Sequence, residues 1–430
     1  MKLVNFGGAT AILEHEGKRM LFDPWLDDGI FHGSWYHFPP TTLGVKDIGH
    51  IDYVYISHIH EDHCSLGTLK HINKDAEIIL MDRQPNLVLM FLNNNNLNFK
   101  KIHLVKTRTP YQIGEGIIVD IIEANPDDEM SHLIDSSLVI NWKGFKIFNA
   151  NDCQPHINGI QYLLNNYGKV DLALLPYSGG SGYPSCYINL SEEKKKSEKN
   201  RIIDSRIKSF IDNVRLINPV YAVPFADQWV VGGSRSELNK FVAHSSCRSV
   251  VCDPFIKAKL NSKLLLLNSG QSYNFDSSKI HPNSPYILQT DSVRDKYINN
   301  SLSNVRYDHE KFIIGYGVNV VRLIQYARSR LWDVQVKQNY YPDYSFYLDV
   351  LDTNQRFFIQ LNTRETEILL LDSELVEPHL RIIMPRNLLI MILIGHISWN
   401  IADAAFFLDY SRIPNTYDPK IYALLNYIKI

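Results

Sequence analysis

The chain has 430 residues, of which 45% are hydrophobic and 21% are charged, a balance typical of folded globular proteins. Its length allows two or three domains. There are 44 lysines and arginines and 46 aspartates and glutamates, which give a net charge of −2. No overall charge therefore favours nucleic acid or an acidic membrane, and we expect a small-molecule ligand instead.

The N-terminal residues do not resemble a secretory signal, because they lack an apolar core and Glu14 and Glu16 interrupt them. The most apolar run, Leu388 to Ile394, is far shorter than the roughly 20 residues that cross a bilayer. The five cysteines are irregularly spaced and form no Cys-x-x-Cys, which argues against a disulfide framework or a zinc ribbon. We therefore expect a cytoplasmic protein that does not enter a membrane.

The first third of the chain is rich in predicted strands. Short apolar runs between turn residues indicate them, and Gly17 and Gly144 mark hairpin turns. The strands are expected at Lys2 to Phe6, Ala11 to Glu14, Arg19 to Phe22, Tyr53 to Ile56, Ile78 to Met81, Ile117 to Ile122, Leu138 to Trp142 and Phe145 to Phe148. One short helix is expected at Leu66 to Ile72.

The rest of the chain divides into two parts. Predicted elements continue with strands at Leu172 to Leu175 and Tyr221 to Pro224 and a polar helix at Glu192 to Leu216. Residues 256–319 are rich in Asn, Ser, Asp and Pro, which favours a connecting or inserted segment between residues 1–255 and 320–430. In the last part, strands are expected at Phe346 to Val350, Arg356 to Leu361 and Glu367 to Leu371, with a helix at Arg386 to Ile394. The last part is therefore predicted to be a smaller α+β domain.

Four metal-binding side chains lie within six residues, directly after the strand that ends at Ile56. They are His58, His60, Asp62 and His63. Histidines two residues apart point the same way from an extended backbone, and the next two side chains are placed to turn toward a second ion about 3.5 Å away. Imidazole and carboxylate suit zinc, iron or manganese alike. The alternative is a histidine-rich polar loop, but this spacing after a strand is specific to metal sites.

Three further residues are candidates for the same centre. His132 precedes the strand Leu138 to Trp142 and is the expected third ligand of the first ion. Asp152 follows the last strand of the predicted hairpin, where a carboxylate can bridge two ions. Asp23 also closes a strand, and we expect it to orient a ligand histidine rather than bind metal. For His132 and Asp152 the alternative is an ordinary loop residue.

With these residues the chain resembles metallo-β-lactamase-fold proteins, and among them the CMP-N-acetylneuraminate hydroxylase family. The matching segments are Asp23 to Leu26, Tyr55 to His63, Lys143 to Cys153, Ser178 to Pro184, Val223 to Ala226, Trp399 to Asn400 and Tyr417 to Pro419. The likeness extends over nearly the whole chain. It implies an α/β fold, an αββα sandwich, with the smaller C-terminal domain covering the mouth of the active site.

The resemblance also implies a division of the ligands between two divalent ions. One ion would be held by His58, His60 and His132 and the other by Asp62 and His63, with Asp152 as the bridge. Asp62 and Asp152 would then be the carboxylates at the reacting centre. The hydroxylase family acts on a nucleotide-activated sialic acid, with iron, dioxygen and electrons from a partner protein. Iron is therefore the expected metal, with zinc or manganese as alternatives.

The chain departs from the hydroxylase pattern in three places. It has no Cys-x-His, which a Rieske cluster needs, so an oxygenase would require a separate electron-transfer protein. The family's last histidine ligand falls where this chain has Val231 to Gly233, and Asp227 is the candidate to replace it. The carboxylate would make the site harder and favour iron or manganese over zinc. The His132 segment is offset by about one residue, so either His132 or Asp135 is the ligand.

Three functions are consistent with these residues. The first is a dinuclear iron oxygenase that hydroxylates a small polar or carrier-activated substrate. The second is a hydrolase of phosphoester, lactone or amide bonds, because paired ions lower the pKa of a bound water and fold does not fix function. The third is a binding or scaffold protein with a degenerate site. Ser178, Gly179 and Gly180 either approach a substrate phosphate through backbone N–H groups or form a tight turn.

Overall fold

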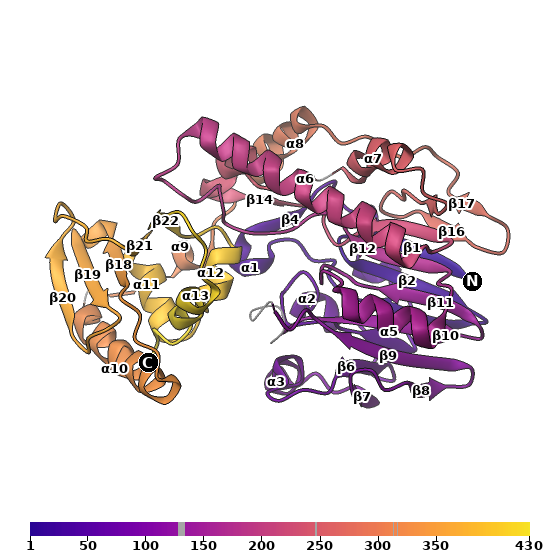
Figure 1. Cartoon of the computed structure of the whole chain (residues 1–430), viewed down its shortest axis with the longest axis horizontal. Helices are drawn as coiled ribbons and strands as arrows, with labels where there is room; N and C mark the ends of the chain where they lie inside the picture. The colour runs from indigo at the N-terminus through magenta and orange to yellow at the C-terminus, as the bar shows by residue number, and fades with distance from the viewer. Residues whose placement is uncertain (128–133, 246, 313, 316) are drawn as a thin grey trace.

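The computed structural model describes residues 1–127, 134–245, 247–312, 314–315 and 317–430. Two large sheets pack face to face and carry helices on their outer faces, and a smaller unit follows at the C-terminal end of the chain (Figure 1). This is the αββα sandwich with a smaller α+β unit that the resemblance implies, so the predicted fold class is confirmed.

The first sheet has eight strands in the order β17-β16-β1-β2-β3-β5-β6-β7. Their bounds are β1 (Lys2–Gly7), β2 (Thr10–His15), β3 (Lys18–Phe22), β5 (Tyr53–Tyr55), β6 (Glu77–Met81), β7 (Lys101–Val105), β16 (Ser272–Asn274) and β17 (Lys279–His281). From β3 to β7 the strands pair in parallel. The loops that follow the parallel strands β3 and β5 therefore leave the same edge of the sheet, which brings the segments after Phe22 and Tyr55 together.

The second sheet has seven strands in the order β15-β13-β12-β11-β10-β9-β8. Their bounds are β8 (Tyr111–Gly114), β9 (Ile117–Glu123), β10 (Ser136–Trp142), β11 (Phe145–Asn149), β12 (Leu172–Pro176), β13 (Tyr221–Phe225) and β15 (Lys263–Leu264). Strand β11 pairs in parallel with β12, and β12 with β13. The segments that follow β11 and β13 hence emerge at one edge, as those after β3 and β5 do in the first sheet.

Alternating side chains explain why both sheets are buried on two faces. In β10, Leu138 and Ile140 enter the core between the sheets, whereas Val139 packs against the helices on the other side. In β5, Tyr55 faces the inner core and Val54 the outer one. The outer helices are α2 (Leu66–Leu69) and α3 (Leu87–Asn94) on the first sheet, and α5 (Ile157–Tyr167), α6 (Glu192–Ile217) and α7 (Cys252–Lys257) on the second.

The long helix α6 has the sequence signals of its ends. Ser191 caps its N-terminal end, since its side chain accepts a hydrogen bond from the backbone N–H of Lys194. Glu192 and Glu193 lie in the first turn, where their negative charges interact favourably with the positive end of the helix dipole. Asn218 ends it in the left-handed conformation, with φ 49°. The predicted helix from Glu192 is therefore confirmed.

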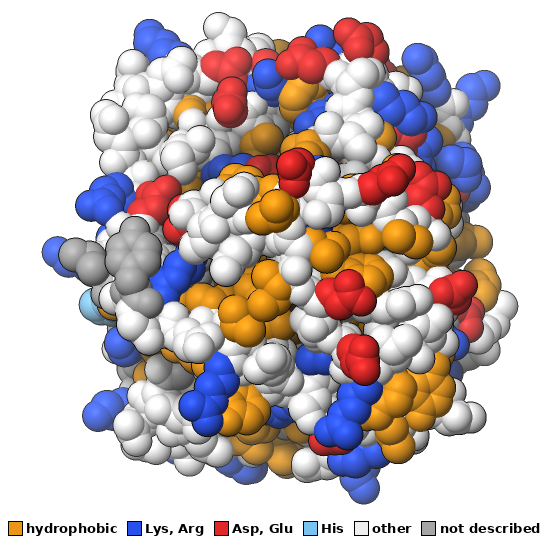
Figure 2. All heavy atoms as spheres, turned by 90° about the vertical axis from the view of Figure 1, so that its left-hand side faces the viewer, with side chains coloured by type: hydrophobic (Ala, Val, Ile, Leu, Met, Phe, Trp, Pro, Cys, Tyr) orange, Lys and Arg blue, Asp and Glu red, His pale blue; other side chains and the backbone are white. Residues whose placement is uncertain are grey.

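The smaller unit is built on a five-stranded sheet in the order β20-β19-β18-β21-β22. Its strands are β18 (Ser345–Val350), β19 (Gln355–Gln360), β20 (Thr366–Leu370), β21 (His379–Met384) and β22 (Asp409–Ile413). The helices of this part are α10 (Val320–Gln338), α11 (Arg386–Leu393), α12 (Trp399–Ala404) and α13 (Pro419–Leu425). Figure 2 shows the outer face of this unit, where apolar side chains gather in the middle with acidic and basic ones among them. This face presents no patch of a single charge.

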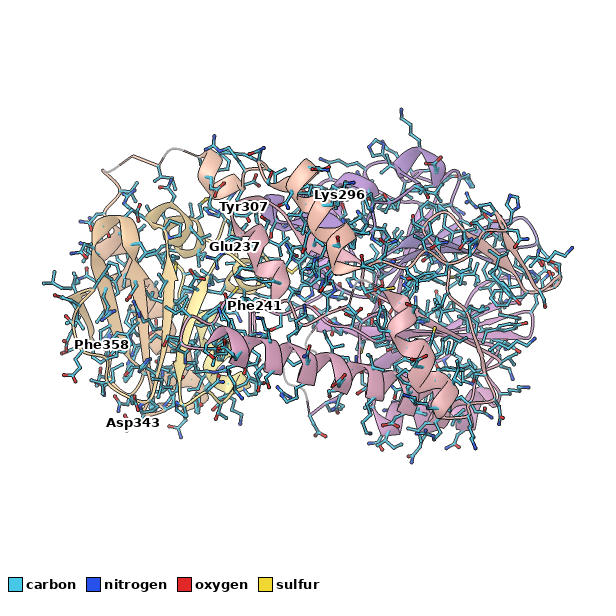
Figure 3. All side chains as sticks on the ribbon, turned by 90° about the horizontal axis from the view of Figure 1, so that it is seen from above. Glu237, Phe241, Lys296, Tyr307, Asp343 and Phe358 are labelled. Atoms are coloured by element: carbon cyan, nitrogen blue, oxygen red, sulfur yellow. The ribbon has the colours of Figure 1, made fainter. Side chains whose placement is uncertain are left out.

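The smaller unit shares a core with the sandwich. The strand pair β4 (Trp35–His37) and β14 (Trp229–Val231) adds Trp35 and Trp229 to the same buried cluster as Phe346. Trp35 donates from Nε1 to the carbonyl of Ala404 at 2.8 Å. Figure 3 shows Tyr307 between the two parts, where its hydroxyl donates to the carbonyl of Gly232 at 2.5 Å. The two parts are therefore held together by packing and by hydrogen bonds.

Residues 256–319 are more regular than their composition predicts. This segment supplies β15, β16 and β17 to the two large sheets, and then forms α8 (Asp291–Tyr297) and α9 (Asp308–Lys311). The sandwich therefore continues past residue 255, where the sequence placed its end. All five cysteines are free, as expected. Among the described residues, no helix combines the length and the apolar character that crossing a bilayer requires.

Candidate metal centre

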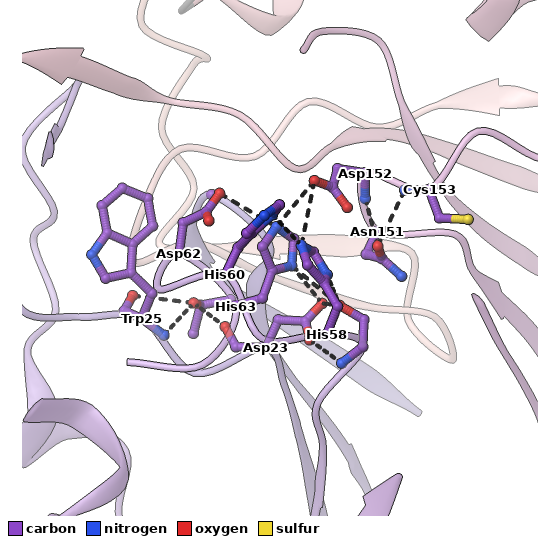
Figure 4. Close-up of polar contacts among 12 residues, drawn as sticks. Asp23, Trp25, His58, His60, Asp62, His63, Asn151, Asp152 and Cys153 are labelled. Carbon is purple, nitrogen blue, oxygen red and sulfur yellow. Dashed lines mark hydrogen bonds and ion pairs between the residues drawn. The ribbon is translucent and has the colours of Figure 1, made fainter. Parts of the chain in front are cut away.

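The loop after β5 places His58 and His63 beside Asp152, which comes from another loop. One ligand atom from each of the three lies within 4.8 Å of the others. The Nε2 atom of His63 is 3.4 Å from Oδ2 of Asp152, and Nε2 of His58 is 3.9 Å from the same oxygen. Asp152 comes from the segment after β11, in the opposite sheet, so the centre lies where the edges of both sheets meet (Figure 4).

Three more ligand-type side chains surround this group. Nε2 of His63 is 3.4 Å from Oδ2 of Asp62. On the other side, Nε2 of His58 is 2.9 Å from Nδ1 of His60 and 3.9 Å from Oδ1 of Asp135. Asp62 thus lies beside His63, and His60 lies beside His58. His132 lies outside the described residues, whereas Asp135, the alternative at that position, is at the centre.

The chemistry of this group fits bound cations. Oδ1 of Asp152 is buried and has no hydrogen-bond partner among the residues that the structure describes. An unpaired buried carboxylate oxygen is costly unless a cation or donor satisfies it. Burial holds the pKa of His58 well below its usual value, so its imidazole is neutral and has a lone pair to donate to a metal. Nitrogen and oxygen ligands of this kind suit zinc, iron and manganese.

Opposite charges dominate the other half of the group. Burial disfavours the charged form of His63, but Asp152, Asp62 and Asp23 outweigh it and raise its pKa well above the usual value. Burial also disfavours the charged form of Asp152 and by itself would raise its pKa. The neighbouring His63 and His58 outweigh this effect and hold the pKa of Asp152 below its usual range. A divalent cation would take the place of the proton that the carboxylates stabilise on His63.

Asp23 contacts a histidine of the centre on the side away from Asp152, the orienting role that the sequence predicts for it. Its Oδ2 is 3.0 Å from Nδ1 of His63, and its Oδ1 accepts the backbone N–H of Ser57 at 2.7 Å. The Ser57 hydroxyl also donates to Asp23 and lies 2.9 Å from Nδ1 of His58. Asp23 and Ser57 therefore orient both buried histidines, so that their Nε2 atoms face Asp152.

We expect Asp23→Asn to weaken metal binding by about 10- to 100-fold without unfolding the chain, because partners of this kind tune their ligands by that amount. Asn also tolerates the φ of 40° that Asp23 adopts, which makes it a better substitution than Ala. Competition with a chelator measures the affinity, and Asp204→Asn on the exposed side of α6 is the control. Equal affinity in the two variants would exclude this role for Asp23.

Asp227 is not placed with the cluster. Its carboxylate is buried in an ion pair with Arg248, with Oδ1 3.2 Å from Nε, and it also accepts the Tyr177 hydroxyl. Burial raises the pKa of Asp227 to about 7, against the opposing effect of Arg248. Each oxygen of the Asp227 carboxylate thus has a hydrogen-bond partner within the protein. The prediction that Asp227 replaces the missing histidine is corrected accordingly. The carboxylate of Asp227 is then also no argument for a preference of the second site for iron or manganese.

The glycine-rich segment has a packing role. A Cβ at Gly180 would lie 3.0 Å from the ring of Trp35 and 3.3 Å from that of Trp229, and one at Gly179 would lie 3.3 Å from Arg206. Ser178 is buried, and its hydroxyl has no hydrogen-bond partner among the described residues. The close approach to the tryptophans accounts for Gly180 by packing alone, and residues 178–180 do not form the tight turn that was the alternative.

Asn400 at the start of α12 is a site residue that the sequence interpretation missed. Its Oδ1 lies 3.0 Å from Nε2 of His60. The contact joins residues 340 positions apart, and no local pattern announces it. The only signal was the Trp399-Asn400 match in the family resemblance. The C-terminal unit therefore contacts the metal loop directly. Such a contact is compatible with the expectation that this unit covers the mouth of the active site.

The chain is similar in sequence to several known proteins. A protein of Mycolicibacterium smegmatis named as a Rieske 2Fe-2S iron-sulfur protein is 32% identical over 192 residues, 44% of this chain and 36% of its own length. The cytidine monophosphate-N-acetylneuraminic acid hydroxylase of Danio rerio is 26% identical over 326 residues, 70% of this chain and 52% of its own. This chain thus spans about a third to a half of the length of these relatives.

Among solved structures, the isothiocyanate hydrolase from Delia radicum gut bacteria is similar with a TM-score of 0.45 and 15% identity, over 64% of this chain and 99% of that chain. The family described as the beta-lactamase superfamily domain matches residues 2–225, just over half of the chain. This stretch includes β1 to β13 and the whole metal loop. The chain belongs to the beta-lactamase superfamily.

Proposed function

We propose that this protein is a dinuclear metal-dependent oxygenase that hydroxylates a small polar or carrier-activated substrate. The observation that supports it is the convergence of His58, His63 and Asp152, with ligand atoms within 4.8 Å of one another, and with further carboxylates beside each histidine. In this proposal His58, His60 and Asp135 or His132 hold one ion, Asp62 and His63 hold the other, and Asp152 bridges them.

One observation is compatible with an oxygenase, and a second favours it. The donor set contains imidazoles and carboxylates and no thiolate: Cys153 lies beside Asp152, but burial raises the pKa of its thiol well above the usual value. Such a nitrogen and oxygen set is compatible with iron. In addition, a hydroxylase from Danio rerio aligns with 70% of this chain. In this proposal an electron-transfer protein supplies the reductant.

The surrounding residues would prepare the centre for this chemistry. Bound iron ions would activate dioxygen. Asp23 fixes the tautomer of His63 by holding its Nδ1 proton, which leaves Nε2 free to bind metal. Asn151 accepts the backbone N–H groups of Asp152 and Cys153 at 2.8 and 3.2 Å, and this holds the segment after β11 in place. In this proposal Asp62 and Asp152 are the carboxylates at the reacting centre.

A hydrolase is the second candidate, and a specific observation keeps it in view. Asp227 is held by Arg248, so the carboxylate that would have favoured iron over zinc is not available to the site. Two zinc ions on the remaining ligands would lower the pKa of a bound water to near neutrality. The same residues would then serve hydrolysis of a phosphoester, lactone or amide.

Metal content distinguishes these candidates. The full chain, purified without chelators, is analysed by inductively coupled plasma mass spectrometry. Two irons per chain, with oxygen consumption driven by an added reductant, would support the oxygenase. Two zincs, with cleavage of p-nitrophenyl phosphate, an aryl lactone or an anilide, would support the hydrolase. A chain that binds neither metal after reconstitution would contradict both and leave a binding or scaffold role.

A further inference from the structure

A cavity of about 620 Å³ lies between the sandwich and the C-terminal unit. The N-terminal half of α6 and the glycine-rich segment form one side of it, and α12, β22 and α13 form the other. Figure 1 shows these elements meeting where the N-terminal end of α6 approaches the smaller unit. Its size is in the range of pockets that hold a small organic molecule.

The cavity lies beside the metal centre. Asn400 is one of its lining residues, and the same side chain contacts Nε2 of His60 at 3.0 Å. A molecule in the cavity would therefore lie against the residue that touches the metal loop. No residue predicted from the sequence as a site residue lines this cavity, so it is a separate feature of the fold.

Arg412 on β22 is the unusual residue of the lining. It is buried, with 4% of its surface exposed. One terminal nitrogen donates to the Tyr422 hydroxyl at 3.1 Å and the other to Oδ1 of Asn415 at 2.9 Å. Its Nε is buried and has no hydrogen-bond partner in the described part of the chain. Within the described part of the chain, no carboxylate forms an ion pair with it, so its charge is uncompensated there.

The other charges in the lining are accounted for. Glu198 pairs with both Lys194 and Arg201, at 3.0 and 2.8 Å. Asp403 is buried, which raises its pKa to about 6, and it shares a hydrogen bond with Tyr410. The cavity thus holds three cations and two carboxylates, and the unpaired cation is Arg412. A buried charge without a partner is strongly unfavourable, and a bound anion would relieve that cost.

Tyrosine rings surround the guanidinium. Its carbon lies 5.0 Å from the ring centre of Tyr187, 5.5 Å from that of Tyr183 and 5.7 Å from that of Tyr422. These contacts offset part of the cost of burying the charge, but they leave Nε without an acceptor. A guanidinium with a free N–H among aromatic rings is suited to an oxyanion attached to a ring.

We propose that Arg412 binds the carboxylate or phosphate group of a ring-bearing organic anion in this cavity, and that the cavity is the substrate pocket of the metal centre. The second half of this inference rests on the proposed function, whereas the anion site itself does not. The anion would lie against the guanidinium of Arg412, which lines the cavity, and the tyrosines would contact its ring. Asn400 would then lie between the bound molecule and His60.

Phenylphosphonate is a suitable probe, because it combines a ring with a phosphoryl dianion and has no ester bond to cleave. We expect saturable binding to the metal-loaded full chain by isothermal titration calorimetry. Arg412→Gln should weaken it about tenfold or more, the range of a charge-assisted hydrogen bond. Arg330→Gln, the same change at an exposed residue of α10, should leave it unchanged. Benzyl alcohol, the neutral analogue, should bind the unaltered chain at least about tenfold more weakly for the same reason.

Three results would overturn the anion site. They are no saturable binding to the unaltered chain, equal binding of phenylphosphonate by Arg412→Gln, and equal binding of the neutral analogue. The last comparison needs no variant, so it holds even if Arg412→Gln does not fold. A purely structural Arg412 predicts a lower melting temperature for Arg412→Gln and no stabilisation of the unaltered chain by the probe.

His63→Ala separates this inference from the proposed function. If this variant loses its metal but still binds phenylphosphonate in an Arg412-dependent way, the anion lies in the cavity and not on the ions. If binding is lost in His63→Ala but kept in Arg412→Gln, the anion binds the metal centre and the cavity proposal fails. If the unaltered chain binds no metal but shows Arg412-dependent binding, the anion site stands and the proposed function fails.

Discussion

Replacing Asp152 by alanine is expected to remove both metal ions from the folded protein. Its Oδ2 lies 3.4 Å from His63 and 3.9 Å from His58, so one carboxylate faces the ligands of both proposed ions. Changing even a residue that only orients a ligand costs about 10- to 100-fold in metal affinity, and loss of a shared ligand should cost more. Mass spectrometry of the purified chain should find two ions before the change and close to none after it.

The fold should survive this change, because Asp152 is partly exposed and forms none of the buried apolar core. Asp204→Ala, an exposed aspartate on α6, is the matched control and should keep both ions. The double variant His58→Ala and His60→Ala should lose one ion and keep the other. Full occupancy in Asp152→Ala would show that Asp152 is not the bridge, and loss of both ions in the double variant would show that the two sites are not separable.

The part of the centre that the sequence predicted is local. His58, His60, Asp62 and His63 are adjacent in the chain, and the strand before them fixes where they emerge. Asp23 was also found from sequence, because it ends the neighbouring parallel strand β3, and parallel strands deliver their loops to one edge of a sheet. Residues of this kind are predictable because the backbone that places them is short.

Contacts between distant segments were not predictable in the same way. Asn400 reaches His60 across 340 residues, and Arg412 lines a cavity with residues of α6. Such contacts depend on how the C-terminal unit packs against the sandwich, and packing leaves no periodic signal in the sequence. The strands β16 and β17 at one side of the first sheet were missed for a related reason, since they are only three residues long and largely polar.

Helix α5 shows a signal that was present but not used. Its buried residues Ile160, Leu163 and Tyr167 recur at three- and four-residue intervals, which is the spacing of an amphipathic helix. Helix α3 was harder to recognise, because it ends in the run Asn93 to Asn96, and asparagine is a weak helix former. Only the cap at Asn86, whose side chain accepts from the backbone of Leu89, marked its start.

Asp227 was assigned wrongly because sequence proximity alone suggested it. It follows β13 closely, and a carboxylate there seemed able to reach the second ion. The side chain that actually pairs with it, Arg248, comes 21 residues later. Arg248 also donates to Oδ1 of Asn5 at 3.1 Å and to the carbonyl of Gly8 at 3.0 Å. Asp227 therefore belongs to a buried network that joins the end of β13 to the β1–β2 hairpin.

This network predicts a large loss of stability in Asp227→Ala. Both side chains of the Asp227–Arg248 pair are fully buried, and removing one partner of such a pair leaves an uncompensated charge that costs about 3–5 kcal/mol. Urea unfolding of the unaltered chain and of Asp227→Ala should show this loss. Burial raises the pKa of Asp227 to about 7, so ionising the carboxylate opposes folding, and the loss should be smaller at pH 8 than at pH 5. Asp227→Asn keeps one acceptor, its Oδ1, for Arg248, and its amide N–H can donate to the Tyr177 hydroxyl, so it should be less destabilised.

Metal content should not follow stability in this series. The folded fraction of Asp227→Asn should bind as many ions as the unaltered chain, because the carboxylate is held by Arg248 and not by a metal. Adding Arg248→Met to Asp227→Ala should restore part of the lost stability, since it removes the unpaired charge. If Asp227→Asn instead lost one ion at unchanged stability, Asp227 would be a ligand after all. A carboxylate ligand from Asp227 would then make the second metal site harder, and this would favour iron over zinc.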